Sequence, residues 1–349
     1  MDHILITGGT GYIGIHTTLN LIEHGLSVTI LDSNINSKKN VFDRVKNFFE
    51  NENFNKNISF NFYQGDILDL SLMQKIFLNA KSSGSPINGV IHFAGLKSFS
   101  DSLLDPIKYW RVNVGGSISL FETMLRNECN TLIFSSSASV YGEKIALVNE
   151  DSDLNPIHPY GNTKVTVEKI LSDIHKYYKS DLKIINLRYF NPIGAHTSGL
   201  IGEYPLMKTN SNLFPKICEV ALSEKKSLKV FGNDWPTRDG TCVRDYIHIM
   251  DVAEAHKIAL LYALNHKKEF LTFNIGRGIG VSILELINIF EKVNKVKISY
   301  QFCERRKGDI PKLIADNSKF KEFFNWLPEK SIEDACFDGW KWMINEKYL

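Results

Sequence analysis

The chain has 349 residues, a length that suits one large domain or two modest ones. Hydrophobic residues make up 43% and charged residues 23%, as in ordinary globular proteins, and the formal net charge of +2 does not suggest a nucleic-acid binder. No apolar stretch approaches the ~18 residues of a membrane span, so no membrane partner is expected. Five scattered cysteines without a C-x-x-C pair favour reduced thiols in a cytoplasmic protein, and no metal site is expected.

Apolar runs and helical stretches alternate along the chain as far as Phe190. Short buried strands are predicted at 3–7, 27–32, 58–66, 89–95, 131–137 and 182–190. Helices are predicted between them, the longest over 103–127 and 160–178. This alternation predicts an α/β fold with a doubly wound parallel sheet that is covered by helices on both faces.

Beyond Phe190 the pattern becomes less regular. Residues 191–215 are polar and irregular, as a segment that covers a ligand would be. Further helices are predicted over 213–224, 251–264, 282–293 and 331–344, with strands at "LKVFG" and "KISYQF".

The first strand runs directly into the glycines of "TGGTGYIG", where Gly8, Gly11 and Gly14 form the pattern G-x-x-G-x-x-G. Glycines let the backbone turn tightly and approach a pyrophosphate, and the following helix N-terminus offers N–H groups. Asp32 ends the second strand, where a carboxylate would accept hydrogen bonds from an adenosine ribose and repel a 2′-phosphate. Strand, turn, helix, strand and acid in this order predict a dinucleotide site that prefers NAD to NADP, rather than a plain turn.

Asp66 and Ile67 follow the third strand and could flank the adenine of a dinucleotide. A capping aspartate before a helix explains this position equally well, and the two roles are compatible.

Tyr160 and Lys164 stand four residues apart in "PYGNTK", at the start of the helix predicted over 160–178. Residues i and i+4 share a helix face, so both side chains can point into one cleft. A lysine ammonium near a phenol lowers the tyrosine pKa, which would make Tyr160 a usable base near neutral pH. A surface helix with an exposed tyrosine and lysine is the alternative that a lone Y-x-x-x-K would favour.

Three serines in "SSSASVYG" end the fifth strand, and ligands of parallel sheets bind at the carboxyl ends of the strands. Ser137 is the candidate that would place a hydroxyl beside the phenol. Loop or capping chemistry is the expected role of Ser135 and Ser136.

Taken together, these motifs resemble the extended short-chain dehydrogenases/reductases, and among them the UDP-glucose 4-epimerases. The resemblance runs from about Ile4 to about Trp340, nearly the whole chain. It is carried by "TGGTGYIG", "GVIHFAGLK", "FSSSASVYG", "PYGNTK", "LRYFNPIGAH", "DGTCVRDYIHIMDVA" and "RRKGDIP".

The resemblance implies a Rossmann NAD domain over 1–190, to which a segment near 240–275 returns, and a smaller mixed α/β domain over 191–349 that mainly binds the UDP-sugar. It also implies that NAD is bound tightly. The residues implied to hold NAD are Gly8, Gly11, Tyr12, Ile13 and Gly14 at the pyrophosphate, Asp32, Asn34, Ile35, Asn36 and Ser37 around the adenosine ribose, Asp66 and Ile67 beside the adenine, Phe93, Ala94, Gly95 and Lys97 along the cofactor, and Asn113, Tyr160, Lys164 and Phe190 near the nicotinamide.

The same resemblance implies the residues that bind the sugar nucleotide. They are Ser137 and Tyr160 at the reacting hydroxyl, Asn191 and Leu313 toward the sugar, and Asn212, Leu213, Lys229, Val230, Phe231, Arg244, Arg306 and Asp309 around the uridine diphosphate. Arginines offer bidentate contacts to phosphate, and two from distant parts of the chain could form a clamp. Surface ion pairs are the alternative for Arg244 and Arg306, and the expectation for Arg238 and Arg305.

The implied reaction interconverts UDP-galactose and UDP-glucose through a transient 4-keto sugar and NADH, in galactose metabolism. Catalytic roles fall to Tyr160, Lys164 and Ser137, with Tyr160 as the base. Weak activity on UDP-N-acetylhexosamines is expected, because Leu313 stands where aromatic residues exclude such sugars in the family. The family forms homodimers through the helix that bears Tyr160 and the long helix before it.

Two rival functions make different demands on the sequence. A sugar-nucleotide 4,6-dehydratase needs an acid–base pair beside the active-site serine, whereas this stretch reads Ser137-Ala138-Ser139. A silent NAD-binding scaffold would tend to lose the tyrosine or lysine, and both are present here. One departure from the family pattern is Cys242, which replaces a glycine two residues before Arg244.

Overall fold

The computed structural model describes residues 2–38, 40–51, 58–142, 146–178, 181–204, 212–223, 226–306 and 308–348. Contacts within the chain divide it into two compact units. The first unit consists of 1–140, 158–188 and 253–272, and the second of 141–157, 189–252 and 273–349. The expected domain boundary at residue 190 and the return near 240–275 remain predictions.

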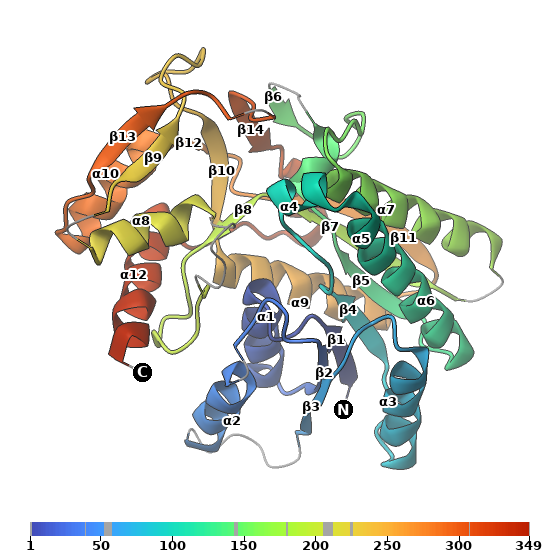
Figure 1. Ribbon diagram of the computed structural model, residues 1–349. Coiled ribbons are helices and arrows are strands. Elements are labelled where there is room, and N and C mark those ends of the chain that lie inside the picture. The colour runs from blue at the N-terminus through green and yellow to red at the C-terminus, as the bar shows by residue number, and fades with distance from the viewer. Residues whose placement is uncertain are drawn as a thin grey trace. The chain divides into compact units, whose positions relative to one another are not determined.

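The largest sheet has seven strands in the order β11-β7-β5-β4-β1-β2-β3 (Figure 1). The bounds are β1 His3–Thr7, β2 Ser27–Asp32, β3 Phe60–Gln64, β4 Gly89–His92, β5 Thr131–Ser135, β7 Lys183–Tyr189 and β11 Glu269–Ile275. The pairings from β3 through β7 are all parallel. The strand order reverses at β1, between β2 and β4, which is the switch point where sheets of this kind bind ligands.

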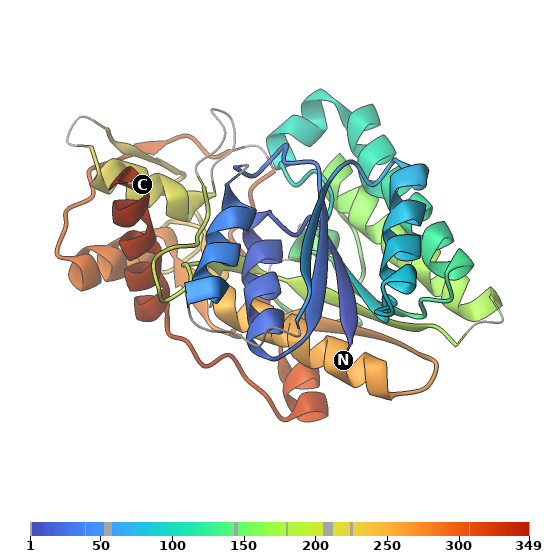
Figure 2. The ribbon, with the colours of Figure 1, turned by 90° about the horizontal axis from the view of Figure 1, so that it is seen from below.

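Helices cover both faces of this sheet, as Figure 2 shows from below. On one face lie α1 Tyr12–Glu23, α2 Val41–Asn51 and α9 Ile249–Asn265, and on the other α3 Leu70–Ser82, α6 Gly116–Arg126 and α7 Pro159–Tyr177. Apolar side chains of the second group, such as Phe77, Leu120 and Leu171, form one buried cluster with strand residues. The predicted doubly wound α/β fold is confirmed.

The helix predicted over 103–127 is divided into four parts. These are α4 Phe99–Leu104, α5 Pro106–Tyr109, the π-helical segment η1 Trp110–Gly115 and α6. Proline cannot continue a helix, but it fits the first turn of a new one. Pro106 therefore begins α5, and the Asp105 carboxylate caps that helix by accepting the Lys108 N–H at 3.1 Å.

Among its described residues, the second unit has two smaller sheets. One contains β6 Ala146–Val148, β8 Asn191–Ile193, β10 Val243–His248, β12 Gly280–Ser282 and β14 Lys312–Ala315, and the other contains β9 Leu228–Phe231 and β13 Tyr300–Cys303. The antiparallel pairing of β10 with β12 and the parallel pairing of β10 with β14 make the first sheet mixed.

Three helices of the second unit pack around one apolar core that includes Phe214, Phe290 and Trp342. They are α8 Leu213–Ala221, α10 Ile283–Asn294 and α12 Ile332–Tyr348, whereas the aromatic rings of α11 Ser318–Phe324 pack on Phe273 of β11. The start of α10 is fixed by a capping box in which Ser282 and Glu285 satisfy each other's backbone N–H groups. Near this core, the buried Cys242 thiol lies against Arg244, and burial raises its pKa.

Candidate active site

The turn after β1 needs glycines, because side chains there would collide with the backbone or fill the space at the start of α1. Gly8 has a positive φ of 72°, and a Cβ there would lie 2.6 Å from the Ala94 backbone nitrogen after β4. A Cβ at Gly14 would collide with the Gly8 carbonyl oxygen. At Gly11, by contrast, a Cβ would meet only the Gly8 oxygen, at 3.3 Å, so protein atoms leave space at the start of α1. That space suits a pyrophosphate at a helix N-terminus.

Asp32 is held at the end of β2 by the same turn. Its two carboxylate oxygens accept backbone N–H groups from Thr10 at 3.0 Å and Asn34 at 2.8 Å. Asn34 has a positive φ of 57°, and its side-chain amide donates to the Ser37 hydroxyl at 3.0 Å. A carboxylate oxygen can accept more than one hydrogen bond, so Asp32 retains capacity for ribose hydroxyls. In the same segment, the Ile35 side chain is exposed.

Asp66 and Ile67 occupy different environments. Asp66 accepts the Leu68 N–H at 2.9 Å, and the neighbouring Asp69 rather than Asp66 caps α3. Ile67 is buried against Gly116 within the apolar cluster of the first unit. The turn geometry thus explains Asp66, while Ile67 contributes to packing as well as to any adenine contact.

Asn113 joins three parts of the first unit. Its amide oxygen accepts the Leu96 N–H at 2.7 Å, and its amide nitrogen donates to the Leu96 carbonyl and to the Thr163 hydroxyl, both at 3.0 Å. The loop of Phe93, Ala94, Gly95 and Lys97 is therefore tied to α7 beside Tyr160. Within this loop, the Phe93 ring lies 4.8 Å from the His256 ring and Lys97 is exposed.

Helix α7 places Tyr160 and Lys164 in its first two turns. Pro159 occupies the first helical position, and the His158 ring nitrogen caps the helix by accepting the Gly161 N–H at 3.0 Å. The His158 and Tyr160 rings are nearly parallel, with centroids 5.9 Å apart and an angle of 3°. The phenol ring is thus oriented by a neighbour that also fixes the start of the helix.

The Lys164 ammonium is buried at the carboxyl end of β5. It donates to the Ser135 carbonyl at 2.7 Å, and lies 4.8 Å from the centre of the Phe134 ring and 6.0 Å from that of Tyr160. Burial lowers the pKa of Lys164 to about 8, while the Glu168 carboxylate acts in the opposite direction. Both Tyr160 and Lys164 are buried, so the alternative of an exposed surface helix is wrong.

Ser137 lies just beyond the last residue of β5. It is half-buried, and its hydroxyl accepts the Ser139 N–H at 3.2 Å, which fixes the turn into a short 3₁₀ helix, η2 Ala138–Tyr141. The first unit thus brings Ser137 and the α7 pair to the same end of the sheet.

A buried ion pair that was not predicted from the sequence lies next to these residues. Glu168 and Arg188 are bonded at 2.6 Å, and the Ser136 hydroxyl donates to the same carboxylate at 2.5 Å. Glu168 follows Lys164 by four residues, so the helical spacing of Tyr160, Lys164 and Glu168 was the signal that could have revealed it. Ser136 is therefore part of this network rather than a loop or capping residue.

In the second unit, four residues expected around a diphosphate converge. The Arg244 and Arg306 guanidinium groups lie 3.9 and 4.0 Å from the two carboxylate oxygens of Asp309. Arg306 also lies over the Phe231 ring, 4.5 Å from its centre. Two cations around one carboxylate leave a net positive charge, which favours an anionic group such as a phosphate.

Arg238 and Arg305 form ion pairs with Glu285 and Asp234, and their side chains are largely exposed. The expectation of surface ion pairs for these two arginines is confirmed.

Arg244 and its neighbour Asp245 point to opposite faces of β10, as successive strand residues do. Arg244 donates to the Ile310 carbonyl at 2.8 Å. Asp245 is fully buried and accepts three backbone N–H groups, from Arg277 and Gly278 at 2.9 Å and from Ala315 at 3.2 Å. Burial raises the pKa of Asp245 to about 6 despite these bonds.

Leu313 lies directly opposite Arg244 in the pairing of β10 with β14. Directly paired residues project from the same face of a sheet, so Leu313 faces the side on which Arg244 stands. The side chain is 9% exposed. This placement favours a role beside the ligand over the interpretation that Leu313 faces only the core.

The remaining residues expected near the substrate, and Phe190, which is expected near the nicotinamide, differ in how deeply they are buried. Val230 is fully buried in the core of the second unit, Lys229 is exposed, and Leu213 packs against the core at its edge. Asn212 is exposed and donates to Glu203 at 2.9 Å. Phe190 is buried and its N–H donates to the Ile275 carbonyl at 3.0 Å, while Asn191 begins β8 opposite Tyr246.

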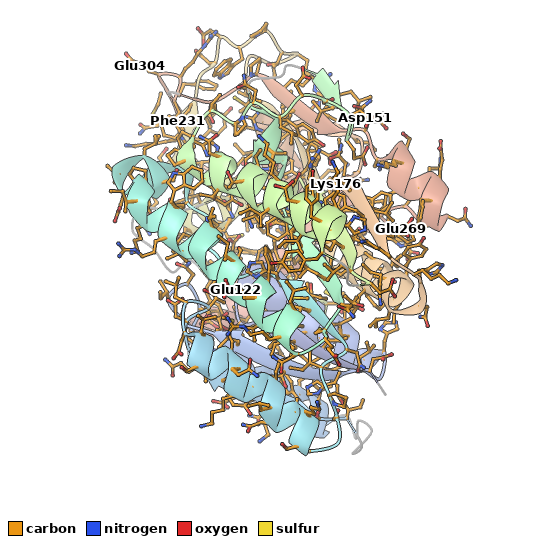
Figure 3. All side chains as sticks on the ribbon, turned by 90° about the vertical axis from the view of Figure 1, so that its right-hand side faces the viewer. Glu122, Asp151, Lys176, Phe231, Glu269 and Glu304 are labelled. Carbon is orange, nitrogen blue, oxygen red and sulfur yellow. The ribbon has the colours of Figure 1, made fainter. Side chains whose placement is uncertain are left out.

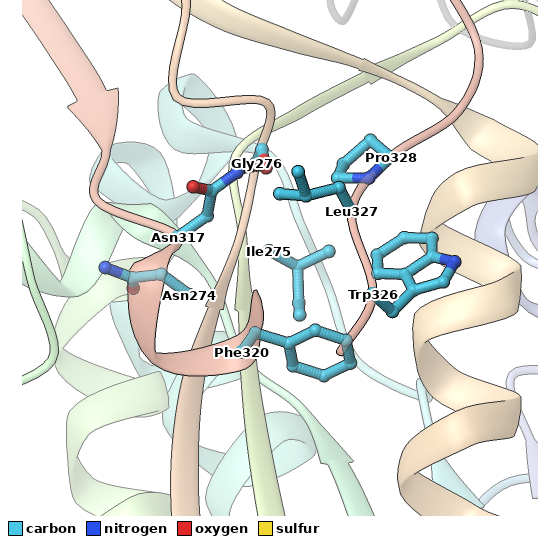
Figure 4. A pocket seen from close by; sticks show the side chains of 8 residues that line it. All are labelled: Asn274, Ile275, Gly276, Asn317, Phe320, Trp326, Leu327 and Pro328. Atoms are coloured by element: carbon cyan, nitrogen blue, oxygen red, sulfur yellow. Dashed lines mark hydrogen bonds between the residues drawn. The ribbon is translucent and has the colours of Figure 1, made fainter. Parts of the chain in front are cut away.

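A small pocket in the second unit is shown in Figure 4. Its lining consists of Asn274, Ile275, Gly276, Asn317, Phe320, Trp326, Leu327 and Pro328. It has room for about one water molecule, and its lining includes no residue predicted for the site.

The described residues contain neither a cluster of metal-binding side chains nor a helix that could span a membrane. Three or more His, Cys, Asp or Glu side chains nowhere gather there in a way that could hold a metal ion. None of the helices described combines the length and the apolar character needed to cross a membrane.

Fold and site together define the class of protein. A Rossmann-like sheet with a glycine turn, an acid after β2, and a Tyr-x-x-x-Lys helix beside a serine make it an extended short-chain dehydrogenase/reductase. The family model described as GDP-mannose 4,6 dehydratase matches residues 5–338.

Comparison with individual proteins narrows the class. The chain is 42% identical to UDP-glucose 4-epimerase 2 of Arabidopsis thaliana over 346 residues, which are 99% of this chain and 96% of the relative. The UDP-glucose 4-epimerase of Stenotrophomonas maltophila, solved with NAD and formylated UDP-arabinopyranose, is 40% identical with a TM-score of 0.92, covering 100% of this chain and 99% of that one. The enzyme of Bifidobacterium longum, solved with NAD+ and UDP, is 36% identical with a TM-score of 0.90, covering 99% of each chain. The chain belongs to the UDP-glucose 4-epimerase family.

Proposed function

We propose that this chain is an NAD-dependent isomerase that interconverts UDP-galactose and UDP-glucose by inversion at C4 of the hexose. The observation that carries the proposal is the arrangement on α7, where Tyr160 and the buried Lys164 stand together at the end of β5. Similarity to the epimerases over nearly the whole chain supports it.

The residues of the first unit fit NAD. The space beside Gly11 would accommodate the pyrophosphate, and the Asp32 carboxylate, which also accepts the Thr10 N–H, would accept hydrogen bonds from the adenosine ribose. When bound, NAD supplies a hydride acceptor and donor for C4 of the sugar. Tight binding is proposed because the cofactor is regenerated in each turnover.

The protein contributes the base, the cation that stabilises the ionised base, and the residues that bind the nucleotide. Tyr160 removes the proton of the 4-hydroxyl and later returns it, with the Ser137 hydroxyl beside it. The Lys164 ammonium stabilises the phenolate and holds the nicotinamide ribose. Arg244 and Arg306 bind the diphosphate, so the sugar can present either face while its nucleotide handle stays in place.

A dehydratase is the rival that the name of the family model suggests. Elimination of water from the sugar needs an additional acid–base pair close to the reacting hydroxyl. Residues 137–139 of this chain are serine, alanine and serine, so this stretch supplies no carboxylate. Epimerisation is the reaction that the site supports.

Incubation of the purified protein with UDP-galactose and with UDP-glucose tests the proposal. Each sugar should yield the same equilibrium mixture of the two, while absorbance in the NADH band reports the transient reduced cofactor. Tyr160→Phe is the matched control. An absence of turnover and of spectral change in the folded, NAD-loaded protein would instead favour a scaffold.

Asp32 should make the chain bind NAD at least tenfold better than NADP. A carboxylate facing a 2′-phosphate costs at least ~1.4 kcal/mol, which is a factor of ten in affinity. Titration of the apoprotein with both cofactors measures the ratio. Asp32→Asn keeps the shape of the side chain but removes the charge, and should bring the two affinities closer together. Equal affinities in the wild type would refute the assignment.

We infer that the protein is a homodimer whose interface includes α6 and α7, the helices turned toward the viewer in Figure 3 with Glu122 and Lys176 labelled. The support is a group of exposed apolar side chains on α6 and on the segments just before it, namely Leu103, Leu104, Ile107, Trp110 and Ile118. Large exposed apolar groups mark interaction surfaces. Sedimentation equilibrium should give twice the chain mass, and Ile107→Glu should shift the protein toward monomer; a monomeric wild type would exclude the dimer.

A cytoplasmic location is also proposed. It is supported by the five cysteines, all of which are free thiols and four of which are buried. Fractionation of the source cells would test it, and recovery from an oxidising compartment would contradict it.

A further inference from the structure

The buried ion pair of Glu168 and Arg188 lies directly behind the residues that carry the chemistry. Both Glu168 oxygens are engaged: one accepts from the Arg188 Nε at 3.0 Å and from the Ser136 hydroxyl at 2.5 Å, and the other from an Arg188 Nη at 2.6 Å. Glu168 is 6% and Arg188 5% exposed. Such a bidentate pair fixes both side chains in one geometry.

This network connects three elements of the first unit. Glu168 lies on α7 and Arg188 on β7, and Ser136 is the residue that follows the last residue of β5. Ser136 stands between Ser135, whose carbonyl accepts from Lys164, and the candidate Ser137. A displacement of Ser136 would therefore move both the acceptor of Lys164 and the Ser137 hydroxyl.

We propose that Glu168, held by Arg188, is a positioning residue that sets the Ser135–Ser137 segment against α7 and so fixes Ser137 and Lys164 relative to Tyr160. This role rests on the proposed epimerase function. Glu168 itself touches neither the reacting atoms nor the cofactor in this scheme; it acts through Ser136 and through its charge on Lys164.

The groups around Lys164 show which charge acts on its ammonium group. Tyr160 and Glu168 face it from its own helix, and His92 faces it from β4. Burial lowers the pKa of His92 to about 3, so this ring is neutral at working pH, and it bonds to Thr7 and Ser117. Arg188 is paired with Glu168. The Glu168 carboxylate is therefore the negative charge next to Lys164 that favours its ammonium form, apart from the Tyr160 phenolate formed in the reaction.

A purely structural ion pair and a positioning pair differ in how they respond to joint replacement. Removing one partner of a buried pair leaves an uncompensated charge, whereas replacing both by apolar residues is often neutral for stability. Glu168→Gln, Arg188→Met and the double variant Glu168→Met with Arg188→Met separate the two cases. Glu219→Gln, which removes a partly exposed partner of Lys216 in the second unit, is the control.

We expect Glu168→Gln to lower kcat for UDP-galactose by about 10- to 100-fold, as small displacements of reacting groups do, with KM within about twofold of the wild type. The decline of kcat on the alkaline side should move to lower pH, because Lys164 loses the charge that favours its protonated form. The double variant should melt close to the wild type and still be slow. Recovery of the wild-type rate together with stability in the double variant would overturn the proposal.

A second measurement does not depend on turnover. NMR of protein labelled with ¹³C at the lysine side chains follows the titration of Lys164 in the NAD-loaded wild type and in the Glu168→Gln variant. A lower titration midpoint in the variant supports the proposal, and an unchanged midpoint refutes it. A wild type that fails to epimerise either sugar while this midpoint still shifts would refute the proposed function without refuting the coupling of Glu168 to Lys164.

Discussion

Replacing Tyr160 by phenylalanine should lower the rate on UDP-galactose by ~10²- to 10⁴-fold, the usual cost of losing a general base. The fold should persist, because the ring is buried and stacked on His158, and phenylalanine preserves both contacts. NAD should remain bound. Steady-state kinetics, the melting temperature and the cofactor content of the purified variant measure the three quantities.

Tyr63→Phe provides the matched control for this substitution. Its hydroxyl accepts from Asn79 at 3.2 Å on the surface of the first unit, so removal of that hydroxyl should leave the rate unchanged. Tyr160→Phe turnover close to that of the wild type would show that another group is the base.

Replacing Leu313 by tyrosine should abolish turnover of UDP-N-acetylgalactosamine and spare that of UDP-galactose. Leu313 faces the same side of the sheet as Arg244. There we expect leucine, which is smaller than tyrosine, to leave room for part of an acetamido group. A larger side chain in a fixed site costs about 1–3 kcal/mol, or one to two decades in preference. For the wild type we expect UDP-galactose to be the better substrate and the N-acetylated sugar to react slowly.

The ratio of kcat/KM for the two sugars checks this prediction. Lys312→Tyr adds the same ring at the neighbouring position, which is exposed and points to the opposite face of β14, and should leave the ratio as it is in the wild type. The idea fails if Leu313→Tyr also leaves the ratio unchanged.

Local sequence patterns predicted the parts of the fold that depend on short-range chemistry. The strand and glycines at 3–14 could be recognised because a tight βα turn needs glycine at Gly8, where φ is positive, and at Gly14, where no Cβ fits. The pairing of Tyr160 with Lys164 followed from helical spacing alone.

Features that depend on distant parts of the chain could not be predicted in this way. Strand β10 was missed because Arg244, Asp245 and His248 interrupt it, so its sequence shows neither an apolar run nor a strict alternation. In the sequence, Glu168 looks like an ordinary residue on a helix surface, because its partner Arg188 stands 20 residues later on β7. Likewise, nothing near Arg244 in the sequence indicates that Asp309 and Arg306 lie beside it.

The buried carboxylate of Asp245 holds the main chain next to the residues that we expect to determine the substrate range. Its three backbone hydrogen bonds fasten β10 to the turn after β11 and to the end of β14, so the main chain near Arg244 is braced from the face opposite that arginine. That brace involves no side chain at position 313. We therefore expect that a substitution at Leu313 changes the room available to the sugar while the backbone around Arg244 stays intact, so that sugar preference could change without any rebuilding of the fold.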